Sequence, residues 1–519
     1  MAVSLGPDQC SSGTFTAPAL FGAEILGLKA STVQNFTRYV SDQEFAHNPE
    51  VFVQDAAFCN VTVTYTHPGQ NDVIIVETWL PFEWNGRLQA VGGGGWTTGR
   101  TELTQSMMAG ALSTGYATST TDGGFGHSQT PIPWALLSPG NVNLYALQNM
   151  GSVTLRDQAM IAKALIRSFY GQPPEFSYFN GCSHGGRQGY QLAQRYPDAY
   201  DGIAASAPAI YWSQFLHAML WPQVVMKSLG QYPRGCELDY IQSAVISLCD
   251  DKDGVSDGII MDPDACEFEP SSLIGTSFYC REIESDMAIS EAAATVAAGF
   301  QRGARGPNDE FLWHGPNWGS NSTTTIFGTP GLAATLCENS TCSGLPFPFG
   351  LWWAGLFIDK DPNFDFASLT AKRFAEQFHL GFQEYTSIIG TTDPDLTLFQ
   401  RAGGKMVTYH GLNDELTPSK GTRDYYEAVT KITPDVHSFY RFFEVPGLGH
   451  CYGGNGGQPT RLFEALRAWV EEGIAPQNVV IDVPGNGSRE ERVICPYPQK
   501  VRASQSRRPG SVKFYCSSD

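Results

Sequence analysis

Apolar and polar residues alternate near the start of the chain in the way that is typical of half-buried strands. Val61–His67 reads VTVTYTH, and a second run, DVIIVETWL, follows the turn HPGQN. This order predicts a hairpin. GRLQAV then predicts a third strand, which leads into the glycine loop Gly92–Gly95.

A helical period appears next. Met160–Gly171 reads MIAKALIRSFYG, with apolar residues along one helix face and a glycine at its C-terminal end. EFSYFN predicts a short strand and RQGYQLAQRYP a helix, with a tight turn between them. The regular part ends near Gly202–Ala209, which reads GIAASAPA.

Residues 207–402 look irregular and are rich in Cys, Pro, Gly and Trp. Regular patterns return with the strands GGKMVTYHG and FYRFFEVPG and the amphipathic helix RLFEALRAWVEEG. A chain of 519 residues is too long for one compact core of ordinary size. We therefore predict an α/β domain, formed by residues 1–206 and 403–519, that is split by an inserted domain of residues 207–402.

Composition narrows the class of protein. Apolar residues make up 42% and charged residues 16%, which is typical of a globular chain. The formal charge of -19 disfavours nucleic acid and anionic lipid surfaces as partners. The sequence has no apolar run of about 18 residues, so we expect no membrane span.

Cysteines and glycosylation triplets indicate export. The twelve cysteines are an even number that suits disulfides. The start, MAVSLGPDQC, lacks a secretory signal, so we expect a secreted mature form whose signal has been removed, with Met1 added for expression. The candidate glycosylation sites are Asn35, Asn60, Asn321, Asn339 and Asn486.

A nucleophile pattern, Gly-x-Ser-x-Gly, lies in the turn between EFSYFN and RQGYQLAQRYP, with Ser183 at its centre. A serine hydroxyl needs a base, and the base needs a third group that orients it. Asp414 in YHGLNDELTP and His450 in EVPGLGHCYGG follow later predicted strands in the order serine, acid, histidine. These three residues predict a catalytic triad.

Two cysteines adjoin this predicted triad. Cys182 directly precedes Ser183, and Cys451 directly follows His450. If Ser183 and His450 are within hydrogen-bond reach, the two cysteines come within the Cα separation that a disulfide needs. Such a bridge would enclose 269 residues, for which the chain-entropy treatment gives about 5–6 kcal/mol. The alternative is that both cysteines pair elsewhere.

With these residues the chain resembles the tannase/feruloyl esterase family, which carries a CS-D-HC pattern. The segments GGGGW, CELDYI and FYRFFEVPGLGHC are similar too, and the resemblance extends over about Cys59–Cys495. It implies an α/β-hydrolase fold with a large lid, and hydrolysis of esters of hydroxylated aromatic acids, feruloyl or galloyl. Related bacterial enzymes cleave terephthalate monoesters. The members of the pattern here are Cys182-Ser183, Asp414 and His450-Cys451.

The expected mechanism is a two-step acyl transfer. His450 takes the proton of Ser183 as the serine attacks the ester carbonyl, Asp414 orients the imidazole, and water then releases the acid. For the oxyanion we expect two main-chain N–H donors, one from His184 and one from Gly93 or Gly94. The alternative for the glycines is a plain flexible turn, and the side chain of His184 is expected to be solvated. No organic or redox cofactor is needed.

The stretch LCDDKDGVSDGIIMDPDAC predicts a metal site. Carboxylates and main-chain carbonyls are the oxygen ligands that calcium prefers, although the spacing is not that of an EF-hand. The resemblance implies a structural calcium in the lid. Asp251 is an alternative ligand, and a solvated acidic turn is the alternative interpretation. The calcium ligands that the resemblance implies are Asp250, Asp253, Val255, Asp257 and Ile259.

The sequence alone does not determine how the other cysteines pair. Cys249 and Cys266 bracket the acidic loop and are expected to bridge. Zinc is not expected, since no CxxC or HExxH spacing occurs. By proximity the remaining pairs are Cys10–Cys59, Cys337–Cys342 and Cys495–Cys516, which leaves Cys236–Cys280.

The substrate is the least determined feature. Candidate aromatic pocket residues are Trp212, Trp313, Trp318 and the run Phe347–Phe357, although so dense a run is more typical of a lid core. We expect a secreted serine esterase acting on feruloyl esters of plant cell-wall polysaccharides, with a small aromatic ester or a feruloylated oligosaccharide as substrate. The alternative is a tannase, which cleaves galloyl esters. A non-catalytic binding protein of the same fold is the remote alternative.

Overall fold

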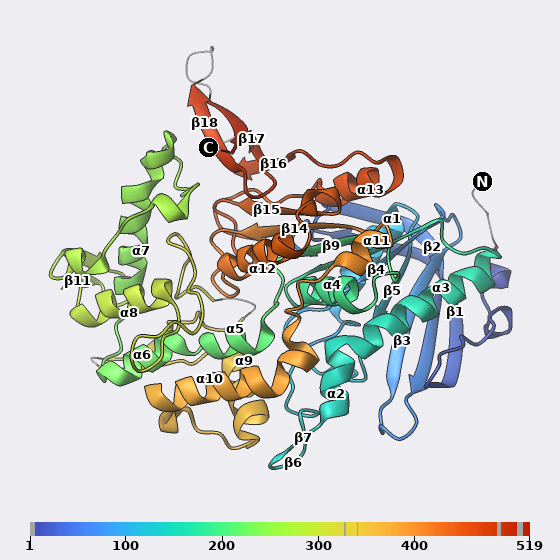
Figure 1. The fold of residues 1–519 in the computed structure, drawn as a ribbon, viewed down its shortest axis with the longest axis horizontal. Coiled ribbons are helices and arrows are strands. Elements are labelled where there is room, and N and C mark those ends of the chain that lie inside the picture. The colour runs from blue at the N-terminus through green and yellow to red at the C-terminus, as the bar shows by residue number, and fades with distance from the viewer. Residues whose placement is uncertain (1–5, 326–327, 340, 485–488, 506–511, 519) are drawn as a thin grey trace.

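A nine-stranded mixed sheet lies at the centre of the molecule (Figure 1). The computed structural model describes residues 6–325, 328–339, 341–484, 489–505 and 512–518. Neighbouring strands follow the order β1, β2, β3, β5, β4, β8, β9, β14, β15. The strands are β1 (Glu24–Val40), β2 (Val51–Thr66), β3 (Ile74–Pro81), β4 (Arg87–Val91), β5 (Ala117–Thr121), β8 (Phe176–Cys182), β9 (Gly202–Ser206), β14 (Lys405–Gly411) and β15 (Tyr440–Val445).

Strand direction divides this sheet into two parts. β1, β2 and β3 pair antiparallel, β3 pairs antiparallel with β5, and all pairs from β5 to β15 are parallel. The predicted hairpin is confirmed, since Tyr65 of β2 pairs with Ile74 of β3. Parallel strands end at one edge of a sheet, so the loops after β8, β14 and β15 are brought together there.

Helices cover both faces of the parallel part. α3, α4 and α12 share one apolar core with one face, and α1 and α13 share another core with the opposite face. α3 ends as predicted at Gly171, whose left-handed backbone (φ 75°) suits a helix C-terminus. These helices are α1 (Glu102–Ser113), α3 (Thr154–Tyr170), α4 (His184–Arg195), α12 (Ser419–Ile432) and α13 (Leu462–Glu472).

The lid is the segment between β9 and β14, most of which occupies the left and lower parts of Figure 1, whereas its last helix, α11, packs against α4. The sequence was expected to be irregular here, and that expectation is wrong. In α10, Phe374 and Phe378 are buried at a helical spacing, a period that the composition of the inserted segment as a whole obscured. The lid helices are α5 (Trp212–Ala218), α6 (Trp221–Leu229), α7 (Gly235–Cys249), α8 (Glu291–Arg302), α9 (Pro348–Trp352), α10 (Ala371–Tyr385) and α11 (Thr397–Arg401).

Short elements complete the structure. A π-helical turn, Asn149–Val153, joins α2 to α3, and two more follow α9 and α10 in the lid. None of the helices in the described ranges combines the length and apolarity that crossing a membrane requires. Besides short 3-10 turns, the structure contains α2 (Leu144–Gln148) and the strand pairs β6 (Leu136–Ser138) with β7 (Asn141–Val142), β10 (Ser277–Cys280) with β11 (Ser285–Ala288), β12 (Thr335–Glu338) with β13 (Thr341–Gly344), β16 (Val479–Pro484) with β17 (Arg489–Ile494), and β18 (Lys500–Gln505) with β19 (Val512–Ser517).

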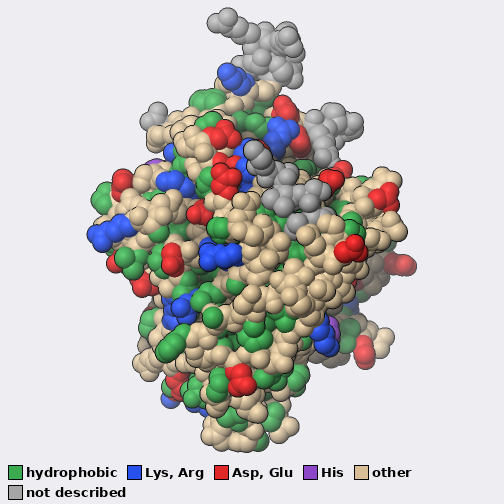
Figure 2. Space-filling model, turned by 90° about the vertical axis from the view of Figure 1, so that its right-hand side faces the viewer, with side chains coloured by type: hydrophobic (Ala, Val, Ile, Leu, Met, Phe, Trp, Pro, Cys, Tyr) green, Lys and Arg blue, Asp and Glu red, His purple; other side chains and the backbone are tan. Residues whose placement is uncertain are grey.

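Charged groups are dispersed over the side of the molecule that bears the N-terminal strands. Figure 2 shows acidic and basic side chains scattered there among uncharged ones, with no single patch of one sign. This face therefore offers no concentrated field for a polyanion.

Candidate active site

The nucleophile candidate lies at the predicted tight turn. Ser183 joins β8 to α4 with φ 62° and ψ −121°, a backbone conformation that non-glycine residues rarely adopt. A Cβ added at Gly181 would lie 2.6 Å from the Gly185 carbonyl carbon, so side chains would not fit there. The Ser183 N–H donates to Ser206 O at 3.0 Å, which ties the turn to β9. The glycine spacing is thus a packing requirement of this turn.

Three side chains from the loops after β8, β14 and β15 meet at one point. The Ser183 hydroxyl lies 2.8 Å from His450 Nε2. His450 Nδ1 lies 2.7 Å from Asp414 Oδ2. Asp414 is 1% exposed and His450 is 4% exposed, so solvent hardly competes for these hydrogen bonds. The structure therefore brings the three predicted residues into one hydrogen-bonded chain.

A disulfide joins the neighbours of this chain. Cys182 and Cys451 are bonded with their Cα atoms 6.1 Å apart. The bond links the last residue of β8 to the loop after β15, at a sequence separation of 269 residues. It holds Ser183 and His450 from both sides of their hydrogen bond.

A second histidine, which sequence analysis missed, also binds the Asp414 carboxylate. His410 Nε2 lies 2.9 Å from Asp414 Oδ2 and 2.8 Å from Thr417 O, and both are acceptors, so this nitrogen donates. The Thr417 hydroxyl and the main-chain N–H groups of Leu416 and Thr417 donate to Asp414 as well, at 2.8–2.9 Å. The only sequence signal was a histidine four residues before the aspartate.

These contacts set the protonation of the pair. Burial favours the neutral acid, but the charge of His450 and the hydrogen bonds from both histidines hold the pKa of Asp414 well below its usual range. Burial also opposes protonation of His450, yet the charge of Asp414 and its hydrogen bond raise the pKa of His450 above 6.5. Asp414 therefore stays ionised beside a histidine that is made more basic.

A further carboxyl group lies next to the pair. Glu415 Oε2 is 3.3 Å from the main-chain nitrogen of His450, which donates to it. Burial, and then the charge of Asp414, raise the pKa of Glu415 to about 7. When ionised, Glu415 raises the pKa of His450 further.

The two candidate glycines for the oxyanion differ in what their N–H groups contact. The Gly93 N–H donates to Gln188 Oε1 at 2.9 Å and therefore points at α4. The Gly94 N–H has only a long contact of 3.4 Å to Thr97 Oγ1. His184 is the first residue of α4, so its N–H has no partner within the helix. Gly94 and His184 thus retain donors beside Ser183, whereas Gly93 anchors the loop.

The side chain of His184 is fully buried, which overturns the expectation that it is solvated. Its ring packs edge-on against Trp212 with centroids 5.0 Å apart. Its Nε2 lies 3.5 Å from Arg187 Nη2. Burial, and the Arg187 charge, hold the pKa of His184 well below its ordinary value. His184 is on α4, but the lid residue Trp212 covers it, and a local pattern does not reveal that contact.

A cavity of about 850 Å³ opens onto Ser183 and His450. The lid contributes apolar side chains, whereas the segments around Ser41–Glu44 and Thr101–Glu102 contribute polar ones, with the apolar Leu103 and Met107 beside the latter. Such a pocket offers apolar contacts to an aromatic ring and hydrogen-bonding groups to a hydrophilic one. The apolar lid residues are Trp212, Phe215, Leu216, Met219, Phe349 and Trp352, and the polar residues are Ser41, Gln43, Glu44, Thr101 and Glu102.

The aromatic candidates for the pocket separate in the structure. Trp212, Phe349 and Trp352 line the cavity, whereas the rest of the run Phe347–Phe357 lies mainly in the lid core. Trp318 lies outside the cavity and packs near the acidic loop. The structure also places Trp313 away from it, against Tyr211 with ring centroids 5.1 Å apart.

The acidic loop lies between Cys249 and Cys266, which are disulfide-bonded. Asp250 Oδ1 accepts three main-chain N–H groups at 2.8–3.1 Å, and Asp257 pairs with Arg492 at 2.6 Å. Burial and the nearby Asp257 and Asp250 charges raise the pKa of Asp253 to about 6. The carboxylates are thus close enough to repel one another.

This loop offers the donor types that calcium prefers, but at a wide spacing. Within the described residues, Asp250, Asp253 and Asp257 do not form a group whose ligand atoms all lie within 4.8 Å of one another. An ion would therefore require the loop to tighten. Val255 and Ile259 lie in the same loop, and their main-chain carbonyl oxygens are of the ligand type that calcium accepts.

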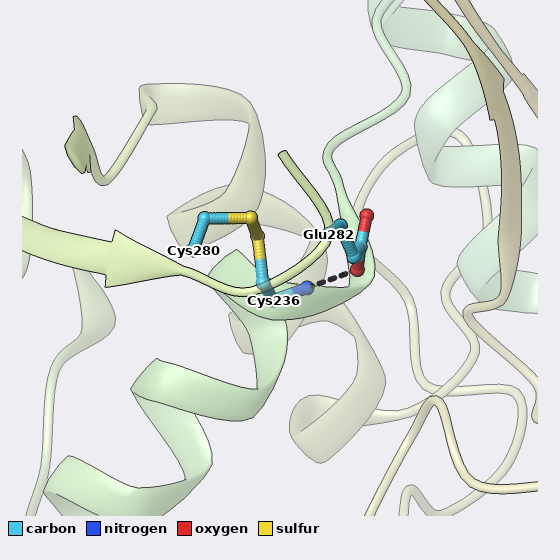
Figure 3. A group of neighbouring side chains, drawn as sticks. All are labelled: Cys236, Cys280 and Glu282. Carbon is cyan, nitrogen blue, oxygen red and sulfur yellow. Dashed lines mark hydrogen bonds between the residues drawn. A yellow bond between two sulfur atoms is a disulfide. The ribbon is translucent and has the colours of Figure 1, made fainter. Parts of the chain in front are cut away.

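The described residues contain one group with such close spacing, Cys236, Cys280 and Glu282 (Figure 3). Its sulfurs form a disulfide, and Glu282 Oε1 accepts the Cys236 N–H at 2.7 Å. The sulfurs are thus used covalently, and the group stabilises the start of α7 rather than binding a metal. The other bonded pairs are as expected, namely Cys10–Cys59, Cys337–Cys342 and Cys495–Cys516.

The glycosylation candidates differ in accessibility. Asn35 and Asn339 are exposed. Asn60 is partly buried and donates to Glu77 at 3.1 Å, and Asn321 accepts two main-chain N–H groups of its own turn. Asn486 lies outside the described residues.

Comparison with known proteins extends the likeness over the whole chain. Residues 59–513 match the family described as Tannase and feruloyl esterase. A protein named probable feruloyl esterase from Arthroderma benhamiae is 37% identical over 513 residues, covering 97% of this chain and 92% of that protein. Tannase from Aspergillus oryzae is 28% identical over 504 residues, covering 85% of this chain and 83% of that protein.

Solved structures share the architecture. Tannin acyl hydrolase from Aspergillus niger aligns with a TM-score of 0.88 at 27% identity, over 100% of this chain and 96% of that one. Feruloyl esterase B from Aspergillus oryzae aligns with a TM-score of 0.78 at 24% identity, over 96% and 97% of the two chains. The likeness therefore includes the insertion between β9 and β14 as well as the sheet.

Proposed function

The chain belongs to the tannase and feruloyl esterase family, and from this premise we propose that it hydrolyses feruloyl esters by a serine acyl-enzyme mechanism. It is a carboxylic ester hydrolase. The observation that carries the mechanism is the hydrogen-bonded chain from Ser183 through His450 to Asp414 at the amphipathic cavity.

The reaction follows from these contacts. His450 Nε2 accepts the proton of Ser183 as Oγ attacks the ester carbonyl, and Asp414 stabilises the imidazolium that forms. Main-chain N–H groups of His184 and Gly94 donate to the oxyanion, where donors fixed in advance are most effective. His450 then protonates the departing alcohol and later takes a proton from the water that releases the acid.

The acyl preference is tested by holding the alcohol constant. Initial rates on methyl ferulate, methyl caffeate and methyl gallate are compared side by side. The proposal expects the highest kcat/KM on methyl ferulate, with total loss in Ser183→Ala. A dominant rate on methyl gallate would instead establish a tannase. That second candidate is retained because the alignment with tannin acyl hydrolase has a TM-score of 0.88.

Catalysis also separates this proposal from a non-catalytic binding protein of the same fold. A serine-directed phosphonate should label the wild-type chain at Ser183 and leave Ser183→Ala unlabelled. Absence of labelling in a folded wild-type chain, together with no ester hydrolysis, would favour a binding role.

We further propose a structural calcium in the acidic loop. Asp250, Asp253 and Asp257 would supply carboxylate oxygens, and Val255 and Ile259 main-chain carbonyls. Support comes from the raised pKa of Asp253 among like charges, which a bound cation would relieve. No step of the reaction involves the ion.

Secretion is part of the same proposal. Twelve cysteines in six disulfides suit an oxidising compartment. Asn35 and Asn339 are the exposed asparagines among the described candidates and are proposed as glycan sites. Peptide mass mapping before and after glycosidase treatment of protein expressed in a eukaryotic host would test both positions.

A further inference from the structure

A second cavity, of about 240 Å³, lies beside the loop that carries His450. Most of its side chains are uncharged polar groups and carboxylates, and Leu448 and Pro484 provide its apolar side chains. Unlike the catalytic cavity it receives no lid residue. The residues that line it are Asp42, Gln43, Leu448, Gly453, Gly454, Gly456, Gln458, Thr460, Asp482 and Pro484.

The segment between β1 and β2 separates the two cavities at one place. Ser41 and Glu44 line the catalytic cavity, and Asp42 lines the second one. Gln43, between them in sequence, lines both. The side chain of Gln43 is exposed, so it adds no closed barrier between the two spaces.

The loop that carries His450 separates the two cavities at another place. Cys451 and Tyr452 line the catalytic cavity, and the next residue, Gly453, lines the second. This loop folds back on itself, with Gly449 N donating to Gly453 O at 3.1 Å. Because consecutive residues of two segments face first one cavity and then the other, the cavities share a wall beside His450.

The lining chemistry points to an uncharged, hydroxyl-rich ligand. Asp42, Thr460 and Asp482 offer acceptors, and Thr460 also offers a donor. No Lys or Arg is among the lining residues, although Arg461, which is not one of them, pairs with Asp482 at 3.7 Å. Carboxylates disfavour an anionic ligand, whereas sugar hydroxyls donate to them readily.

We propose that this cavity is a subsite for the alcohol portion of the ester, accommodating a neutral polyhydroxylated group such as a sugar ring. The inference rests on the proposed function, in which the apolar lid side of the catalytic cavity holds the aromatic acid. Gln43, one of the polar residues of the catalytic cavity, also lines the second cavity, so the alcohol portion has a polar route from Ser183 into it. Its volume suits a group smaller than a drug-sized ligand.

The test holds the acyl group constant and varies the alcohol. The kcat/KM on a feruloylated arabinoxylo-oligosaccharide is divided by the kcat/KM on methyl ferulate. Asp42→Ala and Thr460→Val should each lower this ratio by about fivefold, since each removes a hydrogen-bonding group from the subsite. Asp286→Ala, an exposed aspartate in β11, is the matched control and should leave the ratio unchanged.

A second arm uses charge. Asp42→Asn and Asp482→Asn remove negative charge while keeping polar side chains of the same size. Both should raise the kcat/KM on feruloyl quinate, an ester of an anionic alcohol, relative to methyl ferulate. Ratios that match the wild type in both arms would overturn the subsite, because the side chains would then not contact the alcohol.

Different results would contradict the alcohol subsite and the proposed feruloyl esterase function. If methyl gallate proves the better methyl ester, the same variants are measured on galloyl glucose against methyl gallate. An altered alcohol ratio there would support the subsite in a tannase. An unaltered ratio with an enzyme that still prefers methyl ferulate would remove the subsite and leave the proposed function standing.

Discussion

Cys182 and Cys451 are disulfide-bonded, with their Cα atoms 6.1 Å apart, and each directly adjoins one member of the Ser183–His450 hydrogen bond. The covalent link therefore restrains the distance on which proton transfer depends. Cys182 is the last residue of β8, whereas Cys451 lies outside the helices and strands, so the bond restrains the histidine loop where regular structure does not.

Opening this disulfide should lower kcat by more than the accompanying loss of stability explains. Cys182→Ala with Cys451→Ala should reduce kcat on methyl ferulate by about 10²-fold, because displacements near 1 Å at a catalytic pair have such effects. Cys337→Ala with Cys342→Ala, which removes a disulfide of a lid hairpin, is the control. Full kcat in the first double variant, with the fold intact by circular dichroism, would contradict a catalytic role.

His410 should act through Asp414. His410→Phe keeps a ring of similar size but removes the donor to Asp414 Oδ2, so kcat should fall about tenfold with KM little changed. Thr422→Val removes the partner of His410 Nδ1 and keeps the contact to Asp414, so its effect should be smaller. Equal losses in both variants, or a loss explained by melting temperature, would mean that His410 only supports the fold.

The pH dependence should reveal both His450 and Glu415. His450 must be neutral to accept the serine proton, so kcat/KM should rise with pH through a pKa above 6.5. Glu415→Gln removes a negative charge that raises this pKa, so the acid limb should move to lower pH.

The control for that shift is Glu267→Gln, which neutralises an exposed carboxylate elsewhere in the lid. Its acid limb should coincide with that of the wild type. An acid limb that moves upward in Glu415→Gln, or that moves equally in both variants, would show that Glu415 does not act on His450.

Calcium should stabilise the lid. Adding calcium to chelator-treated protein should raise Tm by several degrees, because a ligand bound only to the folded state stabilises it by about 2.7 kcal/mol at a hundredfold excess over Kd. Asp253→Asn should abolish the response, and Asp286→Asn should preserve it. The same Tm with and without calcium, after metal removal has been verified, would exclude a stabilising ion.

Short-range sequence patterns predicted the secondary structure that positions the triad. The strand–turn–helix around Ser183 follows from short-range pattern and glycine spacing, and the order of Asp414 and His450 follows from the strands before them. β1 was missed because most of its residues are exposed or half-exposed, so its apolar alternation is weak. The lid helices were missed because their surroundings suggested irregular structure.

The sequence did not predict the long-range contacts that position and charge the residues around the triad. Gln188 meets Gly93 from a position 95 residues away, and His184 is buried only because lid residue Trp212 covers it. Such contacts depend on how the lid and the sheet pack, which periodicity does not encode. The same holds for Glu415, whose effect on His450 requires the two loops to meet.

The adjacent loop residues Gly93 and Gly94 differ in how much room a side chain would have. A Cβ on Gly93 would lie 2.1 Å from Thr97 O and 2.5 Å from the Thr98 carbonyl carbon, so Gly93→Ala must displace backbone. A Cβ on Gly94 would meet only Leu103 Cδ2, at an ordinary 3.8 Å, and the substitution keeps the main-chain N–H.

Gly93→Ala should therefore break the hydrogen bond to Gln188, move the adjacent Gly94 N–H, and lower kcat by about 10²-fold, the effect of losing one oxyanion donor. Gly94→Ala should change kcat far less, since its donor stays in place. Gln188→Leu should reproduce part of the Gly93→Ala defect without any steric clash in the loop. If Gly94→Ala proved as damaging as Gly93→Ala at equal stability, the loop would contact substrate through its surface rather than through a fixed N–H group.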